Sequence, residues 1–87
     1  PTNSLGDDAG HHIKRYFAAL KGEPPAAGLH KRIVSEVERP LIEAALYFTK
    51  GNQIKAAHIL GLNRNTLRKK IRDLNISSRR ADYRAGG

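Results

Sequence analysis

Gly61 separates two short stretches of the chain that each have the pattern of an amphipathic helix. Glycine adopts a left-handed backbone at no steric cost, so Gly61 predicts the end of the first helix and a sharp turn after it. Ala56 and Ala57 are small where two helices must cross closely, and Leu60 is apolar on the same side. Two short helices joined by a glycine-containing turn form a helix-turn-helix. The sequence therefore predicts this motif over residues 52–74, within an all-α fold.

Asparagines mark the beginning of both short helices. The side chains of Asn52 and Asn63 can accept hydrogen bonds from the free amides of a first helical turn, which makes both residues good N-caps. In the second helix, Leu67, Ile71 and Leu74 recur at i, i+4 and i+7. That spacing places them on one side of the helix and predicts that they anchor it to the core.

The opposite side of this second helix is basic. Arg64, Arg68 and Arg72 recur at i, i+4 and i+8. Such a helix suits the DNA major groove, where an arginine can donate two hydrogen bonds to guanine O6 and N7. We predict base contacts from Asn63, Arg64 and Arg68. The predicted phosphate contacts, which fix register rather than sequence, are Asn52, Lys55, Thr66, Lys69 and Lys70.

The distribution of charge supports a polyanionic partner. Residues 1–49 contain six basic and six acidic side chains, whereas residues 50–87 contain ten basic and two acidic ones. The whole net charge of +8 therefore lies in the C-terminal part of the chain. A basic surface that serves solubility alone would not explain why the first half is balanced. The segregation favours binding to double-stranded DNA.

Two further helices are predicted before residue 50. Ile13, Phe17 and Leu20 recur at helical spacing and predict a short helix over about residues 9–20. A loop rich in glycine and proline follows at residues 21–28. The next helix has about twenty residues, with apolar side chains every three or four positions. Pro40 lies inside it and predicts a kink near residues 36–40, with two separate helices as the alternative.

The long helix has more apolar surface than one small neighbour can cover. A chain of 87 residues without cysteine has neither a large core nor disulfides to stabilise it. We therefore predict a homodimer in which helices from two protomers pack as a four-helix bundle. The predicted dimer interface consists of Val34, Val37, Leu41, Ala44 and Phe48.

The sequence lacks the residue patterns of an enzyme or a metal site. It contains no paired carboxylates, no Ser/His/Asp set and no phosphate-binding loop, and its four histidines lack metal-ligand spacing. We therefore expect no catalytic activity, no cofactor and no metal. No apolar run has the length of a membrane span and no signal peptide is visible, which favours a cytoplasmic protein without a membrane partner.

The ends of the chain differ from its middle. Residues 1–8 have the composition of a linker or a remnant of cloning, and residues 9–76 form the predicted dimerisation and DNA-binding domain. Residues 77–87 show no periodicity and predict a flexible basic tail. In it, Arg79, Arg80 and Arg84 would add nonspecific affinity for DNA.

Several of these segments resemble the Fis family of helix-turn-helix proteins. The resemblance rests on residues 51–53, 56–57, 60–61 and 63–70, and on residues 36–42 with their internal proline. It covers about residues 13–76. It implies four helices per protomer, the first two forming a dimeric bundle and the last two binding DNA. By position it also implies base-facing roles for Arg64 and Arg68, with Asn63 close to a base, and phosphate-contacting positions for Asn52, Thr66, Lys69 and Lys70.

More narrowly, the chain resembles the C-terminal domain of NtrC-type nitrogen regulators in their alphaproteobacterial form. Such a resemblance implies a nitrogen-responsive, bacterial two-component response regulator that binds palindromic enhancer sites and regulates transcription. It also implies receiver and ATPase domains in the full-length protein, and the alternative sigma factor as partner. The other DNA-binding hypothesis is a nucleoid-type architectural protein that bends DNA with weak sequence preference.

The chain departs from the Fis pattern in three places. Ile54 stands where Fis has a hydroxyl residue near a phosphate, so that contact is not implied. Residues 1–9 have no strand pattern, so the N-terminal arm of Fis and its role in recombination are not implied either. The basic tail after Ile76 extends past the end of the Fis pattern.

Overall fold

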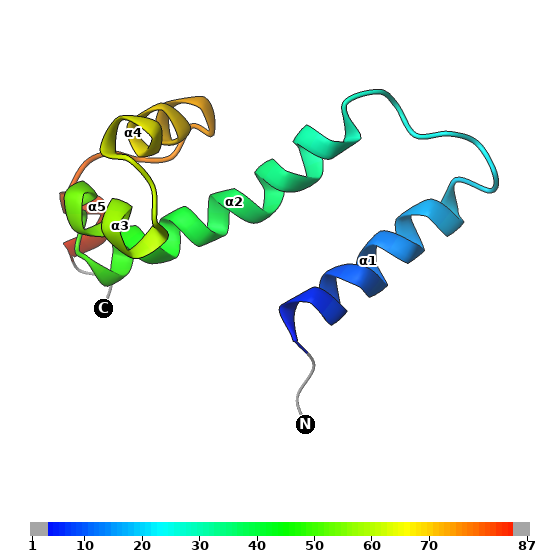
Figure 1. Ribbon diagram of the computed structural model, residues 1–87, viewed down its shortest axis with the longest axis horizontal. Helices are drawn as coiled ribbons and strands as arrows, with labels where there is room; N and C mark the ends of the chain where they lie inside the picture. The colour runs from blue at the N-terminus through cyan, green and yellow to red at the C-terminus, as the bar shows by residue number, and fades with distance from the viewer. Residues whose placement is uncertain (1–3, 85–87) are drawn as a thin grey trace.

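The computed structural model describes residues 4–84, which form helices joined by short loops (Figure 1). The helices are α1 Leu5–Ala19, α2 Leu29–Phe48, α3 Gln53–Leu60, α4 Arg64–Asp73 and α5 Ala81–Arg84. The described residues contain no strand, so the predicted all-α fold is confirmed. The single-turn helix α5 is an addition to the four helices that the sequence predicts.

The first helix begins earlier than the sequence analysis predicts. Ser4 is its N-cap: the Ser4 hydroxyl accepts a hydrogen bond from the Asp7 amide at 3.0 Å, and the Asp7 carboxylate accepts one from the Ser4 amide. This reciprocal capping box satisfies two donors that would otherwise be free. The predicted start near Ala9 is therefore wrong, and residues 5–8 are helical rather than linker. Residues 1–3 of the predicted linker lie outside the described residues.

The long helix α2 continues through Pro40. It begins after Gly28, whose φ of 87° lies in the left-handed region, and it ends at Phe48. Pro40 has no N–H to donate to the carbonyl of Glu36, yet the helix does not end there. The alternative of two separate helices is therefore wrong.

Helix α1 lies beside the N-terminal half of α2 but outside the core (Figure 1). The Arg32 guanidinium donates a hydrogen bond to the Tyr16 hydroxyl at 3.2 Å and links the two helices. No residue of Leu5–Ala19 is buried. The pairing of α1 and α2 within one protomer therefore leaves apolar surface on both helices.

The hydrophobic core lies where the C-terminal end of α2 packs on α3, α4 and α5 (Figure 1). Ile42, Leu46 and Leu67 have the largest fully enclosed side chains. The other buried members are Ala45, Ala56, Ala57, Ile71, Ile76 and Tyr83. All of them lie after Pro40, so this core fixes the second half of the molecule and leaves the first half to other contacts.

The turn between α3 and α4 has the predicted geometry. The Asn52 side chain accepts a hydrogen bond from the Lys55 amide at 3.1 Å, and the Asn63 side chain accepts one from the Asn65 amide at 2.7 Å. Gly61 ends α3 with a φ of 72°. The predicted caps and the helix-turn-helix are therefore confirmed.

The C-terminal tail is folded as far as the structure describes it. Tyr83 in α5 is 4% exposed, and its ring meets that of Tyr47 edge to face, with 4.8 Å between ring centroids. Its hydroxyl donates a hydrogen bond to the Ser77 carbonyl. The prediction of a flexible tail is therefore wrong over residues 77–84. The sequence carries no signal for this packing, because a helix of one turn is too short to show periodicity. Residues 85–87 lie outside the described residues.

The turn between α2 and α3 provides a test of this tail packing. Gly51 has a φ of 82°, and a Cβ atom there would lie 2.9 Å from the Cα atom of Arg80. Gly61 has a φ of 72°, but a Cβ atom there would meet nothing within 4 Å. Gly61→Ala is expected to cost about 1–2 kcal/mol for the left-handed backbone alone. Gly51→Ala is expected to lower the free energy of unfolding by about 1–3 kcal/mol more than Gly61→Ala does, because the tail must shift to admit the new Cβ atom.

Denaturant unfolding of both variants at one protein concentration measures this difference. Equal losses for Gly51→Ala and Gly61→Ala would contradict the packing of the tail on the turn.

Candidate nucleic-acid interface

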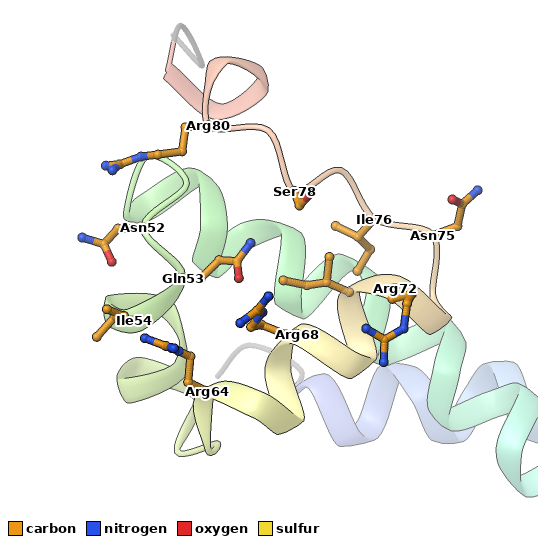
Figure 2. Close-up of a pocket in the computed structure, with 11 residues that line it drawn as sticks. Asn52, Gln53, Ile54, Arg64, Arg68, Arg72, Asn75, Ile76, Ser78 and Arg80 are labelled. Atoms are coloured by element: carbon orange, nitrogen blue, oxygen red, sulfur yellow. The ribbon is translucent and has the colours of Figure 1, made fainter.

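One side of α4, the start of α3 and the segment after α4 surround an open groove of about 720 Å³ (Figure 2). The side chains along it are polar or basic except for three isoleucines, and none is acidic. They belong to Asn52, Gln53, Ile54, Arg64, Arg68, Ile71, Arg72, Asn75, Ile76, Ser78 and Arg80. Four arginines without an opposing carboxylate in the groove suit an anionic ligand.

The core determines which side of α4 faces this groove. Leu67 and Ile71 are buried against the rest of the protein, and the three arginines of α4 are exposed on the adjoining side of the helix. Arg64, Arg68 and Arg72 follow one another at i, i+4 spacing, where like charges repel. Within residues 4–84, no salt bridge neutralises any of the three. A polyanion in the groove would relieve that repulsion.

The predicted asparagines already make backbone contacts. Asn63 caps α4 from outside the groove, and its side-chain N–H groups are left to donate to a ligand. Asn52 caps α3 and also lines the groove. Both residues therefore fix the position of a helix start beside the arginines.

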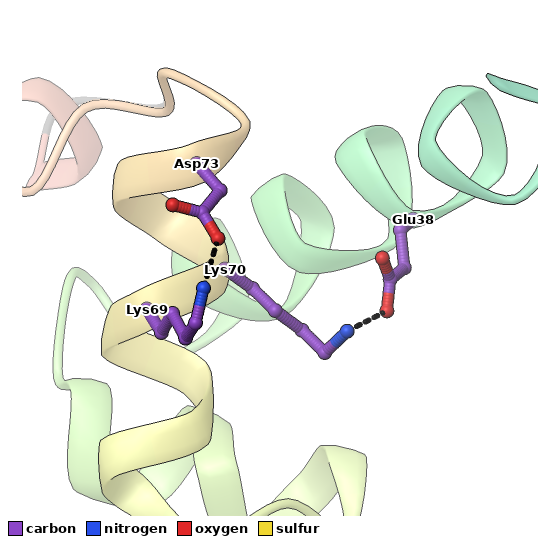
Figure 3. A network of polar contacts seen from close by, with 4 residues as sticks. All are labelled: Glu38, Lys69, Lys70 and Asp73. Atoms are coloured by element: carbon purple, nitrogen blue, oxygen red, sulfur yellow. Dashed lines mark hydrogen bonds and ion pairs between the residues drawn. The ribbon is translucent and has the colours of Figure 1, made fainter. Parts of the chain in front are cut away.

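The two predicted lysines of α4 lie outside the groove, in ion pairs (Figure 3). Lys69 Nζ lies 2.7 Å from Asp73 Oδ2, one turn along α4. This hydrogen bond lowers the pKa of the Asp73 carboxyl below its ordinary value. Lys70 Nζ lies 2.7 Å from Glu38 Oε2 and joins α4 to α2. In this structure the two lysines contribute to the attachment and the local charge balance of α4.

The remaining predicted residues are dispersed. Thr66 is exposed on α4 and does not line the groove. Lys55 lies at a second, more apolar hollow with Phe48, His58 and Ile59. Of the eight predicted DNA-contacting residues, the groove therefore brings together Asn52, Arg64 and Arg68.

The groove also contains polar residues for which the sequence analysis predicted no specific contact: Gln53, Arg72, Asn75, Ser78 and Arg80. The i+8 spacing between Arg64 and Arg72 in the sequence could have identified Arg72 as a groove residue, because it places both on the same side of α4. No local pattern identifies Arg80, because its position depends on the tail crossing a turn almost thirty residues earlier in the chain. The position of Arg80 is therefore set by tertiary packing rather than by the local helix propensity of the tail.

Two other kinds of feature are absent from the part of the chain that the structure describes. Residues 4–84 contain no cluster of three or more metal-ligating His, Asp or Glu side chains. None of the helices in this range is long and apolar enough to cross a membrane.

The ion pair of Lys70 with Glu38 is expected to stabilise the fold more than that of Lys69 with Asp73. The side chains of the first pair are 33% and 26% exposed, whereas those of the second are 67% and 54% exposed. Solvent screens the second pair more strongly. A double-mutant cycle on unfolding, with each partner replaced by alanine, should give a coupling of about 0.5–1 kcal/mol for Glu38 and Lys70. A larger coupling for the exposed pair would contradict the role of Lys70 in attaching α4 to α2.

Comparisons with known proteins agree with the geometry. Residues 33–74 match the family described as "Bacterial regulatory protein, Fis family". The chain is 66% identical over 65 residues to the DNA-binding transcriptional regulator NtrC of Azospirillum brasilense, which covers 75% of the chain and 14% of that protein. It is 50% identical over 82 residues to NtrC of Rhizobium meliloti (strain 1021), covering 94% of the chain and 17% of that protein.

Similarity to shorter proteins covers more of their length. The chain is 41% identical over 73 residues to the DNA-binding protein Fis of Yersinia pestis (strain Pestoides F). This match covers 84% of the chain and 74% of that protein. The chain thus spans a small part of the NtrC relatives and about three quarters of the Fis relative.

Proposed function

The chain belongs to the Fis family of bacterial helix-turn-helix regulatory proteins, and from this premise we propose that it binds palindromic enhancer sites sequence-specifically as a homodimer. It would do so as the DNA-binding domain of a nitrogen-responsive transcriptional regulator. The observation that carries the proposal is the groove beside α4, in which Arg64, Arg68 and Arg72 face outward without a carboxylate.

The proposed base contacts come from the N-terminal half of α4. In a helix-turn-helix, the first residues of the second helix contact base edges in the major groove. Arg64 is the first residue of α4, Arg68 follows one turn later, and Asn63 is the cap. An arginine at such a position can distinguish guanine by two hydrogen bonds to O6 and N7. Arg64 and Arg68 are therefore proposed as base contacts, with Asn63 beside them.

The proposed phosphate contacts surround this half of α4. Asn52 lies at the start of α3 in the groove, and Lys55 and Thr66 are exposed on α3 and α4. Lys69 and Lys70 would exchange Asp73 and Glu38 for DNA phosphates. Because each exchange breaks an ion pair within the protein, either lysine would contribute less binding free energy than a lysine without such a partner.

The proposed dimer covers the apolar surface that one protomer leaves open. Val34, Val37, Leu41 and Phe48 are exposed large apolar side chains on α2, and Ala44 is exposed between them. Their spacings alternate between three and four residues, which is the spacing of a helix–helix seam. Ile13 and Phe17 add exposed apolar surface on α1. A second copy of α1 and α2 would bury these side chains in a four-helix bundle.

The role within a longer protein rests on the NtrC relatives. The chain spans 14–17% of the length of the NtrC proteins reported above. We infer that the natural protein carries receiver and ATPase domains before this segment and acts with the alternative sigma factor. It would then be a response regulator in the bacterial cytoplasm, associated with the nucleoid. The domain itself would comprise the predicted residues 9–76, extended to residue 4 by the capped start of α1 and to residue 84 by the packed segment.

A selection from random duplexes tests sequence-specific binding. The domain is mixed with a library of random double-stranded DNA, and the bound fraction is amplified and sequenced through several rounds. The proposal predicts enrichment of an inverted repeat with half-sites about one helical turn apart. The matched control is the Arg64→Ala, Arg68→Ala double variant, which should lose that enrichment.

The same selection distinguishes the second candidate, an architectural protein that bends DNA with weak sequence preference. The similarity to Fis over 74% of the Yersinia pestis protein favours keeping this candidate. An architectural protein of this kind predicts enrichment of flexible base-pair steps without a defined inverted repeat. A library that remains unenriched for any inverted repeat would therefore contradict the sequence-specific function.

A further inference from the structure

The segment after α4 crosses the turn between α2 and α3 in direct contact. The α carbon of Arg80 would lie 2.9 Å from a Cβ atom on Gly51, a separation that real Cβ atoms essentially never show. Gly51 is buried and has a φ of 82°. Only a residue without a side chain allows the tail to lie this close to the turn. The tail is therefore packed at Arg80 against the turn that leads into α3.

Two buried side chains hold the tail on either side of Arg80. Ile76 precedes it in the core and Tyr83 follows it. The Tyr83 ring packs on Tyr47 of α2, and its hydroxyl donates to the carbonyl of Ser77. Burial raises the pKa of Tyr83 above its ordinary value, which favours the protonated phenol that donates this hydrogen bond. The backbone at Arg80 is thereby fixed relative to α2 and α3.

This packing places Arg80 at the groove described above. Arg80 lines the groove together with Asn52, Arg64 and Arg68. In Figure 2, Asn52 lies between Arg80 on one side and Arg64 on the other. Arg80 is exposed, and it makes no salt bridge within residues 4–84. Its guanidinium is therefore free for an anionic ligand at the edge of the groove formed by the start of α3.

We propose that Arg80 contacts a DNA phosphate at this edge of the groove and that Tyr83 is the positioning residue that holds it there. The inference rests on the proposed DNA-binding function and adds a phosphate-contacting residue at the edge of that site. A contact by a fixed arginine differs from the diffuse attraction of a flexible basic tail, because it depends on one residue and on the packing beneath it.

The primary test compares Arg80→Ala with Arg84→Ala. Both substitutions remove one positive charge from the same segment, but Arg84 does not line the groove. Binding to a labelled palindromic duplex and to a scrambled duplex is measured by fluorescence anisotropy at several salt concentrations. Arg80→Ala is expected to weaken binding to both duplexes about tenfold, since a phosphate contact carries no sequence information.

The salt dependence gives a second readout. The loss of one contact per protomer should reduce the slope of log K against log salt by about 2 for a dimer. Arg84→Ala should leave affinity within about twofold and the slope unchanged. Equal effects of the two substitutions would show diffuse attraction and would overturn the proposal.

The positioning role of Tyr83 is tested by combining substitutions at Tyr83 and Arg80, because two residues that act through one contact should not have additive effects. Tyr83→Ala is expected to lower affinity and salt slope as much as Arg80→Ala does, while having no further effect on either quantity in the Arg80→Ala background. Tyr83→Phe keeps the ring on Tyr47 and should restore most of the binding. Additive losses in the double variant would overturn the positioning role, and circular dichroism of each variant confirms that α1 to α4 remain folded.

The wild-type measurement separates this inference from the proposed function. If the wild-type domain binds neither duplex at low salt, the proposed function itself is wrong. If the wild-type domain binds but Arg80→Ala matches it in affinity and salt slope, the inference about Arg80 alone is wrong.

Discussion

Leu41→Glu is expected to convert the domain to a monomer and to weaken binding to a palindromic duplex about a thousandfold. Leu41 lies in the middle of the proposed α2 seam, between Val37 and Ala44. In a dimer, the glutamate would place a charge in an apolar interface without a partner, which costs several kcal/mol. A monomer can occupy only one half-site at a time, so it loses the specific affinity that two linked half-sites give.

Ile59→Glu is the matched control for this substitution. Ile59 is 52% exposed and Leu41 is 53% exposed, and both changes add one negative charge. Ile59 belongs to α3 and is not one of the five proposed seam residues of α2, although it shares a hollow with the last of them, Phe48. Sedimentation equilibrium should give a dimer for the wild-type domain and Ile59→Glu, and a monomer for Leu41→Glu. A dimeric Leu41→Glu variant would place the interface elsewhere.

Arg64→Ala is expected to cost about 1–3 kcal/mol per half-site on the cognate duplex, and therefore about 2–6 kcal/mol per palindrome. Arg64 is the first residue of α4 and lines the groove without a carboxylate partner. The loss on a scrambled duplex should be much smaller, because only the electrostatic attraction of one charge is lost there. The ratio of cognate to scrambled affinity should therefore fall.

Lys69→Ala is the control for the base-contacting role of Arg64. It removes the same charge from α4, but Lys69 pairs with Asp73 outside the groove. Titration of both duplexes should show similar, small losses for this variant. If Arg64→Ala leaves the cognate-to-scrambled ratio intact, the assignment of Arg64 as a base contact is wrong.

Local signals in the sequence were sufficient to predict the helix-turn-helix. Asn52, Gly61 and Asn63 each act through hydrogen bonds or backbone geometry within a few residues, so their roles follow from residue type and spacing. Leu67 and Ile71 recur with the period of a helix and are buried as predicted. The side of α4 that carries Arg64 and Arg68 followed from the same period.

The features that the sequence analysis missed depend mostly on contacts distant in the chain. Lys70 pairs with Glu38 on another helix, and no spacing rule connects them. The tail is packed because Tyr83 meets Tyr47 and Arg80 meets Gly51, although the tail itself has no period. The early start of α1 is different, since Ser4 and Asp7 have the spacing of a capping box and this signal was available.

The most direct test of the central claim is the affinity of the domain for its selected palindrome against a scrambled duplex, measured by fluorescence anisotropy across a salt series. We predict two protomers per duplex, a steep salt slope, and an affinity ratio of about a thousand or more. Equal affinity for both duplexes would contradict sequence-specific recognition by the arginines of α4.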